Sequence, residues 1–144
     1  AWLGTPLPRV RPDVHTLRDP HSGEESVAFP AIRADVVVIH ALVADRMGNA
    51  RLGGNLGLDR ELAMASDQVI VTAERLVDRL DGPLEMPGVR TTAVVEVPRG
   101  AWPTSCYPDY PVDGDELLDY VEACSGGAFD AYLERFSSGA ASGT

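Results

Sequence analysis

The most regular feature of the chain is a set of three short apolar runs rich in valine and isoleucine. They are DVVVIHA at 35–41, QVIVTA at 68–73 and TTAVVEV at 91–97. These runs lack the strict polar alternation of a half-exposed strand, and such runs are typical of strands buried on both faces of a parallel sheet. The pattern therefore predicts three strands of one sheet.

Apolar residues at helical spacing lie between and after these runs, where they recur at i, i+3 or i+4 and predict helices. The predicted helices cover 58–65, 76–80, 117–121 and 129–136. The third has a start signal, because Asp113 and Glu116 stand three positions apart as a capping box. Gly126 and Gly127 then separate it from the fourth helix.

Strands that alternate with helices predict an α/β domain, which we expect over residues 34–136. The expected architecture is a partial, mainly parallel sheet with flanking helices. Three strands leave an edge and a face of the sheet uncovered. We therefore expect another polypeptide to complete the sheet, either an obligate partner or a missing N-terminal half.

The two ends of the chain differ from this middle part. Residues 1–33 contain Pro6, Pro8, Pro12, Pro20 and Pro30. Proline at this density excludes helix interiors and central strands, so it predicts an extended arm with turns. At the other end, SSGAASGT at 137–144 is small and polar, which predicts a flexible tail.

Composition and charge narrow the classes of partner. The 144 residues, 44% of them apolar, suit one domain with a core. The formal net charge of −10 disfavours nucleic acid and anionic membranes, because both require basic residues to neutralise phosphate. No apolar run reaches the roughly 18 to 20 residues of a membrane span, and no signal peptide is evident. We expect a cytoplasmic protein whose partners are small molecules or proteins.

The stretch IHALVADRMGNARL at 39–52 is the first candidate for chemistry. His40 stands at the predicted carboxyl end of a strand, where open α/β sheets bind ligands. Asp45, Gly48 and Asn49 follow. Two interpretations remain open: a pocket wall in which His40 or Asn49 offers hydrogen bonds, or a turn in which Asp45 caps the backbone and Gly48 adopts a positive φ.

The loop after the third strand is the second candidate, because Ser105, Cys106 and Tyr107 place a hydroxyl, a thiol and a phenol side by side. A cysteine nucleophile would need a base, for which His40 is the histidine at a strand end. The simpler interpretation is a loop cysteine without a reactive role. Cys106 and Cys124 lie 18 positions apart without a CxxC pair or a histidine cluster, so we expect free thiols and no metal ligands.

Read in order, several segments resemble the C-terminal half of the α subunit of family I CoA-transferases, of the glutaconate CoA-transferase type. The matching pieces are GEE with PAIRADV, HALVADRMGN, the block Met64–Asp78 and VEVPRGAWPTSC. Together they extend over roughly residues 5 to 136, in the family's order. The resemblance implies the α/β fold that CoA-transferases share with sugar-phosphate isomerases.

The resemblance also implies a mechanism and a partner. In this family a glutamate attacks the acyl-CoA thioester and carries CoA as a glutamyl thioester to an acceptor carboxylic acid. In two-subunit members that glutamate lies on the β subunit, and this chain lacks the SENG or ExGxG-like motif that carries it. The resemblance thus implies no catalytic residue in this chain, a β-subunit partner, coenzyme A as a substrate moiety, and no permanently bound cofactor.

Within that resemblance, His40, Asp45, Asn49, Ser105, Cys106 and Tyr107 are expected to contact substrate or the subunit interface. The segment YPDYPVDGD departs from the family's GYYDYD pattern, which indicates a reshaped pocket. Some relatives hydrolyse ring-derived CoA thioesters. A CoA-thioester hydrolase or ring-cleaving enzyme and a non-catalytic scaffold subunit therefore remain as alternatives to a transferase.

Overall fold

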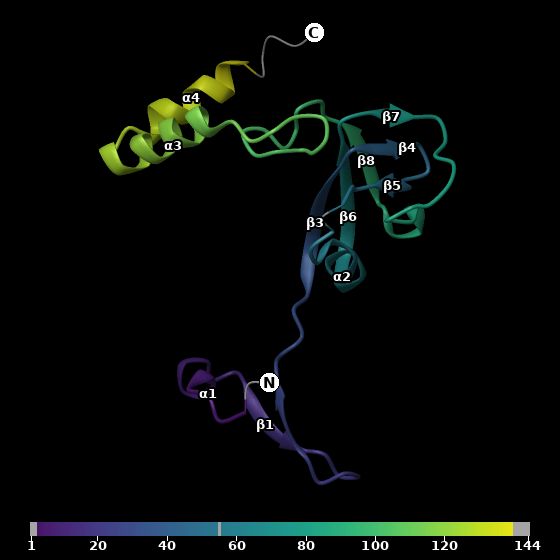
Figure 1. Ribbon diagram of the computed structural model, residues 1–144, viewed down its shortest axis with the longest axis vertical. Coiled ribbons are helices and arrows are strands. Elements are labelled where there is room, and N and C mark those ends of the chain that lie inside the picture. The colour runs from purple at the N-terminus through teal and green to yellow at the C-terminus, as the bar shows by residue number, and fades with distance from the viewer. Residues whose placement is uncertain (1–2, 55, 140–144) are drawn as a thin grey trace. The chain divides into compact units, whose positions relative to one another are not determined.

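The computed structural model describes residues 3–54 and 56–139, and it divides into two compact units between Ala34 and Asp35. The first unit contains a short helix, α1 (Leu7–Val10), and a hairpin of β1 (His15–Arg18) and β2 (Glu25–Ala28) (Figure 1). β1 and β2 pair antiparallel with Arg18 opposite Glu25. The prolines of this unit lie outside both strands, so the expected arm with turns contains a hairpin that its sequence pattern did not indicate.

The second unit is built around a three-stranded sheet in the order β3 (Ala34–Ala41), β6 (Ser66–Ala73) and β8 (Ala93–Glu96). These strands are the three apolar runs of the sequence, which confirms the predicted sheet. β6 and β8 are parallel, with Val71 opposite Val94. The core lies on one face of this sheet, where Ile39, Val69 and Val71 are buried.

A second, smaller sheet has the order β5 (Ala50–Arg51), β4 (Val43–Asp45) and β7 (Leu76–Val77). β4 pairs antiparallel with β5 and parallel with β7. The helix predicted at 76–80 is therefore wrong. The segment instead forms β7, because its backbone pairs with β4 and the Glu96 carboxylate accepts a hydrogen bond from Leu76 N at 2.9 Å.

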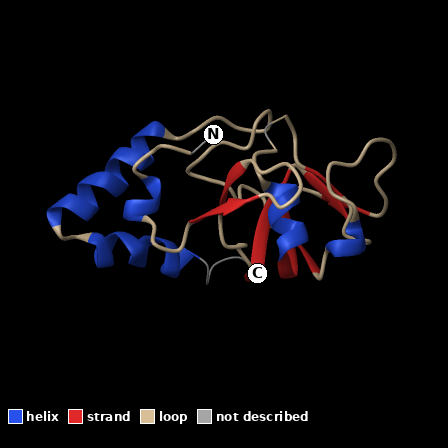
Figure 2. Cartoon of the chain, turned by 90° about the horizontal axis from the view of Figure 1, so that it is seen from below, coloured by secondary structure: helices blue, strands red, loops and turns tan. Residues whose placement is uncertain are grey.

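The helices agree with the remaining sequence patterns. α2 (Asp59–Ala65) packs against β6, and α3 (Gly114–Gly126) packs against α4 (Phe129–Gly139) (Figure 2). Asp113 caps α3 by accepting a hydrogen bond from Glu116 N, but the second bond of the expected capping box is replaced, because Asp113 N donates to Pro103 O. Gly127 ends α3 with a φ of 72°. A 3-10 turn (Gly88–Arg90) precedes β8. Among the described residues, none of the helices combines the length and apolarity needed to cross a membrane.

α4 extends through Gly139, so residues 137–139 of the expected tail are helical in backbone. The rest of that tail, residues 140–144, lies outside the described residues.

Candidate functional site

The site begins with two residues at the carboxyl ends of β3 and β6. His40 is the penultimate residue of β3, and Glu74 directly follows the last residue of β6. His40 Nε2 lies 2.7 Å from Glu74 Oε1, and His40 Nδ1 lies 2.9 Å from Thr72 Oγ1. Because the strands are neighbours in the sheet, their ends bring together residues that are 34 positions apart.

Glu74 is a buried carboxylate with both oxygens engaged. Oε1 accepts from His40 and from the Tyr110 hydroxyl, and Oε2 accepts from Arg99 N at 2.6 Å. Burial raises the pKa of Glu74, but the hydrogen bonds from Tyr110, Arg99 and His40 together lower it by more, so the pKa lies below its usual value. Glu74 is therefore ionised at neutral pH and serves as an acceptor.

Tyr110 fastens the loop after β8 to this carboxylate. Its hydroxyl donates to Glu74 and accepts from Ala101 N at 3.0 Å. The Arg99 guanidinium lies over the Tyr110 ring, 5.2 Å from its centroid. Burial, followed by the hydrogen bond to Glu74, raises the pKa of Tyr110 to about 12, so the phenol keeps its proton.

A cavity of about 450 Å³ opens beside this network. It is lined by His40, Leu52, Gly54, Asp59, Ala101, Ser105, Cys106 and Tyr107. Four of the six candidate residues from the sequence thus meet at one cavity: His40, Ser105, Cys106 and Tyr107. The apolar and polar lining, with a carboxylate at Asp59, is suited to an amphipathic small molecule.

Asp45 and Asn49 occupy a separate place in the structure, the turn after β4. The Asp45 carboxylate accepts from Met47 N, from Asn49 N and Nδ2, and from Leu80 N, at 2.9–3.1 Å. The Asn49 side chain also accepts from Gly88 N at 2.9 Å. Asp45 is fully buried. These contacts match the turn interpretation of the sequence, in which Asp45 caps the backbone.

Cys106 is held in its loop by its backbone, which forms a bridge with Tyr110. Burial, with the negative charges of Glu74 and Asp109, raises the pKa of the Cys106 thiol. A thiol that stays protonated is a weak nucleophile. The Cys106 sulfur nevertheless lies close to the two strand-end residues, since ligand atoms of His40, Glu74 and Cys106 are all within 4.8 Å of one another.

Sequence reasoning missed Glu74 and Tyr110. Glu74 carried a usable signal, because a carboxylate that directly follows a buried strand must find donors at the sheet end. Its position at a strand end is the same feature that singled out His40. Tyr110 carried no such signal, because its partner becomes visible only when the loop folds back over β6.

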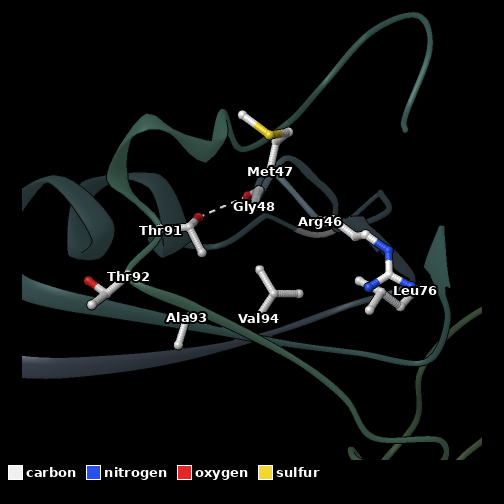
Figure 3. Close-up of a pocket in the computed structure, with 8 residues that line it drawn as sticks. All are labelled: Arg46, Met47, Gly48, Leu76, Thr91, Thr92, Ala93 and Val94. Atoms are coloured by element: carbon white, nitrogen blue, oxygen red, sulfur yellow. Dashed lines mark hydrogen bonds between the residues drawn. The ribbon is translucent and has the colours of Figure 1, made fainter. Parts of the chain in front are cut away.

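A second cavity, of about 260 Å³, lies beside the start of β8 (Figure 3). Its polar groups already have partners: Thr91 Oγ1 donates to Gly48 O at 2.8 Å, and Thr92 Oγ1 accepts from Val69 N. Arg46 pairs with Asp78, and both side chains are largely exposed. With these polar groups satisfied and no candidate nucleophile in its lining, this cavity is a poorer candidate than the one at His40 and Cys106.

The chain belongs to the coenzyme A transferase family. The family model of coenzyme A transferase matches residues 9–97, which confirms the resemblance read from the sequence. The chain is 40% identical to a subunit of 3-oxoadipate CoA-transferase from Pseudomonas knackmussii over 78% of its length and 41% of that protein. It is 36% identical to a subunit of glutaconate CoA-transferase from Acidaminococcus fermentans, over 79% of this chain and 38% of that one.

A solved structure is also similar to the described fold. A variant of the decarboxylase AibA/AibB superposes with a TM-score of 0.81 at 34% identity, over 92% of this chain and 49% of that one. The chain thus spans between about two fifths and one half of the length of these proteins. Similarity of fold therefore extends to a protein that is named for a reaction other than transfer of CoA.

Proposed function

We propose that the chain is the C-terminal part of an α-type CoA-transferase subunit, which helps to move CoA from an acyl-CoA to a carboxylic acid. The observation that carries the proposal is the cavity at the carboxyl ends of β3 and β6, in a chain of this family. In this role His40, Ser105, Cys106 and Tyr107 border the substrate, while Asp45 and Asn49 hold the neighbouring turn.

The chain positions the substrate, and a glutamate on a β-subunit partner attacks the thioester. Glu74 is poorly suited to be that nucleophile, because both of its oxygens accept hydrogen bonds and its pKa lies below the usual value. Cys106 is poorly suited as well, because its thiol stays protonated. Coenzyme A enters as a substrate moiety and is not held permanently.

The uncovered face of the main sheet supports the need for a partner. Val36, Val38 and Val95 have exposed fractions of 47%, 60% and 47%. The register of β6 and β8 places Val95 beside Thr72, whose hydroxyl contacts His40, so these valines continue the face that leads to the site. Sheets with parallel strands normally have both faces covered. A β subunit, and a separate N-terminal half of the α subunit, are the polypeptides that we expect to cover it.

The decisive experiment locates the covalent intermediate. The chain is co-expressed with its partner and incubated with short-chain and dicarboxylic acyl-CoAs in the absence of an acceptor. A transferase then retains CoA on a glutamate, because the intermediate discharges only slowly to water. Mass spectrometry after borohydride reduction should find this glutamate on the partner and leave residues 1–144 unmodified.

Each other outcome contradicts part of the proposal. An adduct on Glu24, Glu25, Glu74 or Glu96 would place the nucleophile in this chain. Release of free CoA without transfer to added acids would favour the hydrolase alternative, and inertness would favour a scaffold subunit.

A cysteine variant tests the role of the thiol. The complex with Cys106→Ser should keep a reaction rate within about a hundredfold of wild type, which corresponds to roughly 2.7 kcal/mol of activation free energy. A greater loss would indicate thiol catalysis.

A further inference from the structure

Three side chains that are far apart in the sequence converge at the end of the main sheet. His40 comes from β3, Glu74 from the end of β6 and Cys106 from the loop after β8, and their ligand atoms lie within 4.8 Å of one another. Glu74 is only 8% exposed, so this is not a cluster of solvated surface charges. The geometry points to a metal-binding site on His40, Glu74 and Cys106, with Zn²⁺ as the expected ion.

The choice of ion follows from the donor atoms. Imidazole nitrogen, carboxylate oxygen and thiolate sulfur together suit a borderline-soft cation, and Zn²⁺ accepts all three. Calcium and magnesium prefer oxygen donors alone, so they are disfavoured here. Three protein ligands also leave one tetrahedral position for water or another oxygen.

The contacts around the three ligands resemble those that orient metal ligands in proteins. A histidine ligand usually donates its second ring N–H to an oxygen, which fixes the nitrogen that faces the metal. Thr72 Oγ1 lies 2.9 Å from His40 Nδ1 and leaves Nε2 to face Glu74. The second Glu74 oxygen accepts from Arg99 N, and Oε1, which keeps a hydrogen bond from the Tyr110 hydroxyl, is the oxygen on the side of His40.

Binding requires a small rearrangement and a defined transfer of protons. His40 Nε2 and Glu74 Oε1 are 2.7 Å apart, whereas bonds of about 2.0–2.2 Å to a tetrahedral Zn²⁺ hold two ligand atoms roughly 3.3 Å apart. The ion replaces the hydrogen bond between these atoms, and the Nε2 proton moves to Nδ1, where Thr72 Oγ1 accepts a hydrogen bond from it. Cys106 releases its thiol proton to solvent and binds as the thiolate.

The charges that face the cluster favour a cation. Glu74 and Asp109 act on Cys106 as negative charges, opposed by Arg75, which is itself paired with Asp109 at 2.8 Å. A divalent ion would neutralise Glu74 and the Cys106 thiolate together. His40 and Cys106 also line the 450 Å³ cavity, so the ion would stand in its wall. No spacing motif in the sequence indicates a metal, because the three ligands come from segments that only the fold brings together.

Metal binding is measured directly, so its outcome is separate from that of the transferase assay. The chain, co-expressed with its partner, is stripped with a chelator and titrated with Co²⁺, whose thiolate complexes absorb in the near ultraviolet. We expect one Co²⁺ per chain with a thiolate charge-transfer band, and displacement of that ion by one equivalent of Zn²⁺.

Variants of the proposed ligands, with a control cysteine, test which residues bind the ion. Cys106→Ala should abolish the band, whereas Cys124→Ala, at the exposed cysteine of α3, should leave it unchanged. Glu74→Gln should weaken affinity at least tenfold, and Thr72→Val by about 10–100-fold through loss of the contact to His40. Absence of the band in the wild-type protein, or its survival in Cys106→Ala, would overturn the inference, and the wild-type titration does not depend on any variant folding.

Discussion

His40 Nε2 lies 2.7 Å from Glu74 Oε1, and this contact joins the carboxyl ends of two neighbouring strands. The same carboxylate also receives the Tyr110 hydroxyl and the Arg99 N–H. One buried anion therefore ties β3, β6 and the loop after β8 together. That loop places Ser105, Cys106 and Tyr107 along the cavity. Its conformation should therefore depend on the hydrogen-bond donors to Glu74.

Replacement of Tyr110 by phenylalanine tests this dependence. Tyr110→Phe removes the hydroxyl that links Glu74 to Ala101 N, and a hydrogen bond to a buried charge contributes about 1.5–3 kcal/mol. We expect a loss of that size in the free energy of unfolding, measured by urea denaturation of the chain with its partner. Tyr107→Phe is the matched control, because Tyr107 is 83% exposed and should change stability by less than about 0.5 kcal/mol.

An equal loss in the two variants would mean that the Tyr110 hydroxyl does not anchor the loop. The ring itself stays in both variants, so its contact with the Arg99 guanidinium is retained and does not contribute to the difference.

Asp45 should make the protein sensitive to acid. Burial raises the pKa of Asp45, but hydrogen bonds from Asn49, Leu80 and Met47 together lower it by more, to below the ordinary value of 3.8. A carboxyl group with a lowered folded-state pKa stabilises the protein above the unfolded-state pKa, and this stabilisation is lost as the pH falls through the folded-state value. We therefore expect the free energy of unfolding to decrease as the pH falls below about 4.

Asp45→Asn isolates this contribution. The amide keeps the size of the side chain but loses the charge that its four donors need, which costs on the order of 2–3 kcal/mol at pH 7. Denaturation curves from pH 7 to pH 3 should show a smaller decrease in stability for the variant than for wild type. The exposed Asp78→Asn is the control, and parallel pH profiles for Asp45→Asn and wild type would contradict the assignment.

The long apolar runs predicted their strands correctly, whereas the shortest strands could not be predicted from the sequence. The runs at 35–41, 68–73 and 91–97 became β3, β6 and β8, because continuous stretches rich in valine and isoleucine favour strands. β5 and β7 are two residues long, and a segment of that length carries no measurable periodicity. Pairing with β4 decides their conformation, which explains why the segment 76–80 was mistaken for a helix.

In the candidate site too, local sequence patterns revealed some residues, and contacts between distant segments decided the others. His40 was found because it ends an apolar run, and Cys106 because three reactive groups are adjacent. Glu74 and Tyr110 depend on contacts across more than 30 positions, and their roles follow from the fold of a loop that no local pattern specifies. At Asp45, three of the four donors are local, from Met47 and Asn49, and only Leu80 N comes from a distant segment, so the turn interpretation was open to sequence reasoning.

Two glycines with similar backbone angles should respond differently to alanine. Gly48 has a φ of +84°, and a Cβ there would lie 2.6 Å from Thr91 Cβ. Gly82 has a φ of +86°, and apart from its two chain neighbours no residue has a heavy atom within 4 Å of a Cβ placed there. Both variants carry the cost of a left-handed backbone, about 1–2 kcal/mol. Gly48→Ala should cost at least about 1 kcal/mol more, because it also overpacks the wall of the second cavity (Figure 3).

Thermal or urea denaturation of the two variants measures this difference. Equal losses would mean that the contact between Gly48 and Thr91 is not close in solution.

The exposed valines on the open face of the main sheet lead to a prediction about assembly. Val38 is 60% exposed in the middle of β3, on the face opposite the buried Ile39. An apolar sheet face left in water drives association. Without its partner, the chain should therefore self-associate, and with its partner it should form a defined complex, as measured by native mass spectrometry and thermal melting.

Val38→Asp should prevent this association, because a carboxylate on the covered face would lose its hydration without gaining a partner. Val89→Asp is the matched control: Val89 is 87% exposed but lies in the 3-10 turn (Gly88–Arg90), outside the strands of the main sheet. We expect Val38→Asp to reduce complex formation by at least tenfold and to leave the isolated chain less aggregated, with Val89→Asp close to wild type. A wild-type chain that is monodisperse and folds cooperatively without a partner would show that water, and not protein, covers the valines of β3.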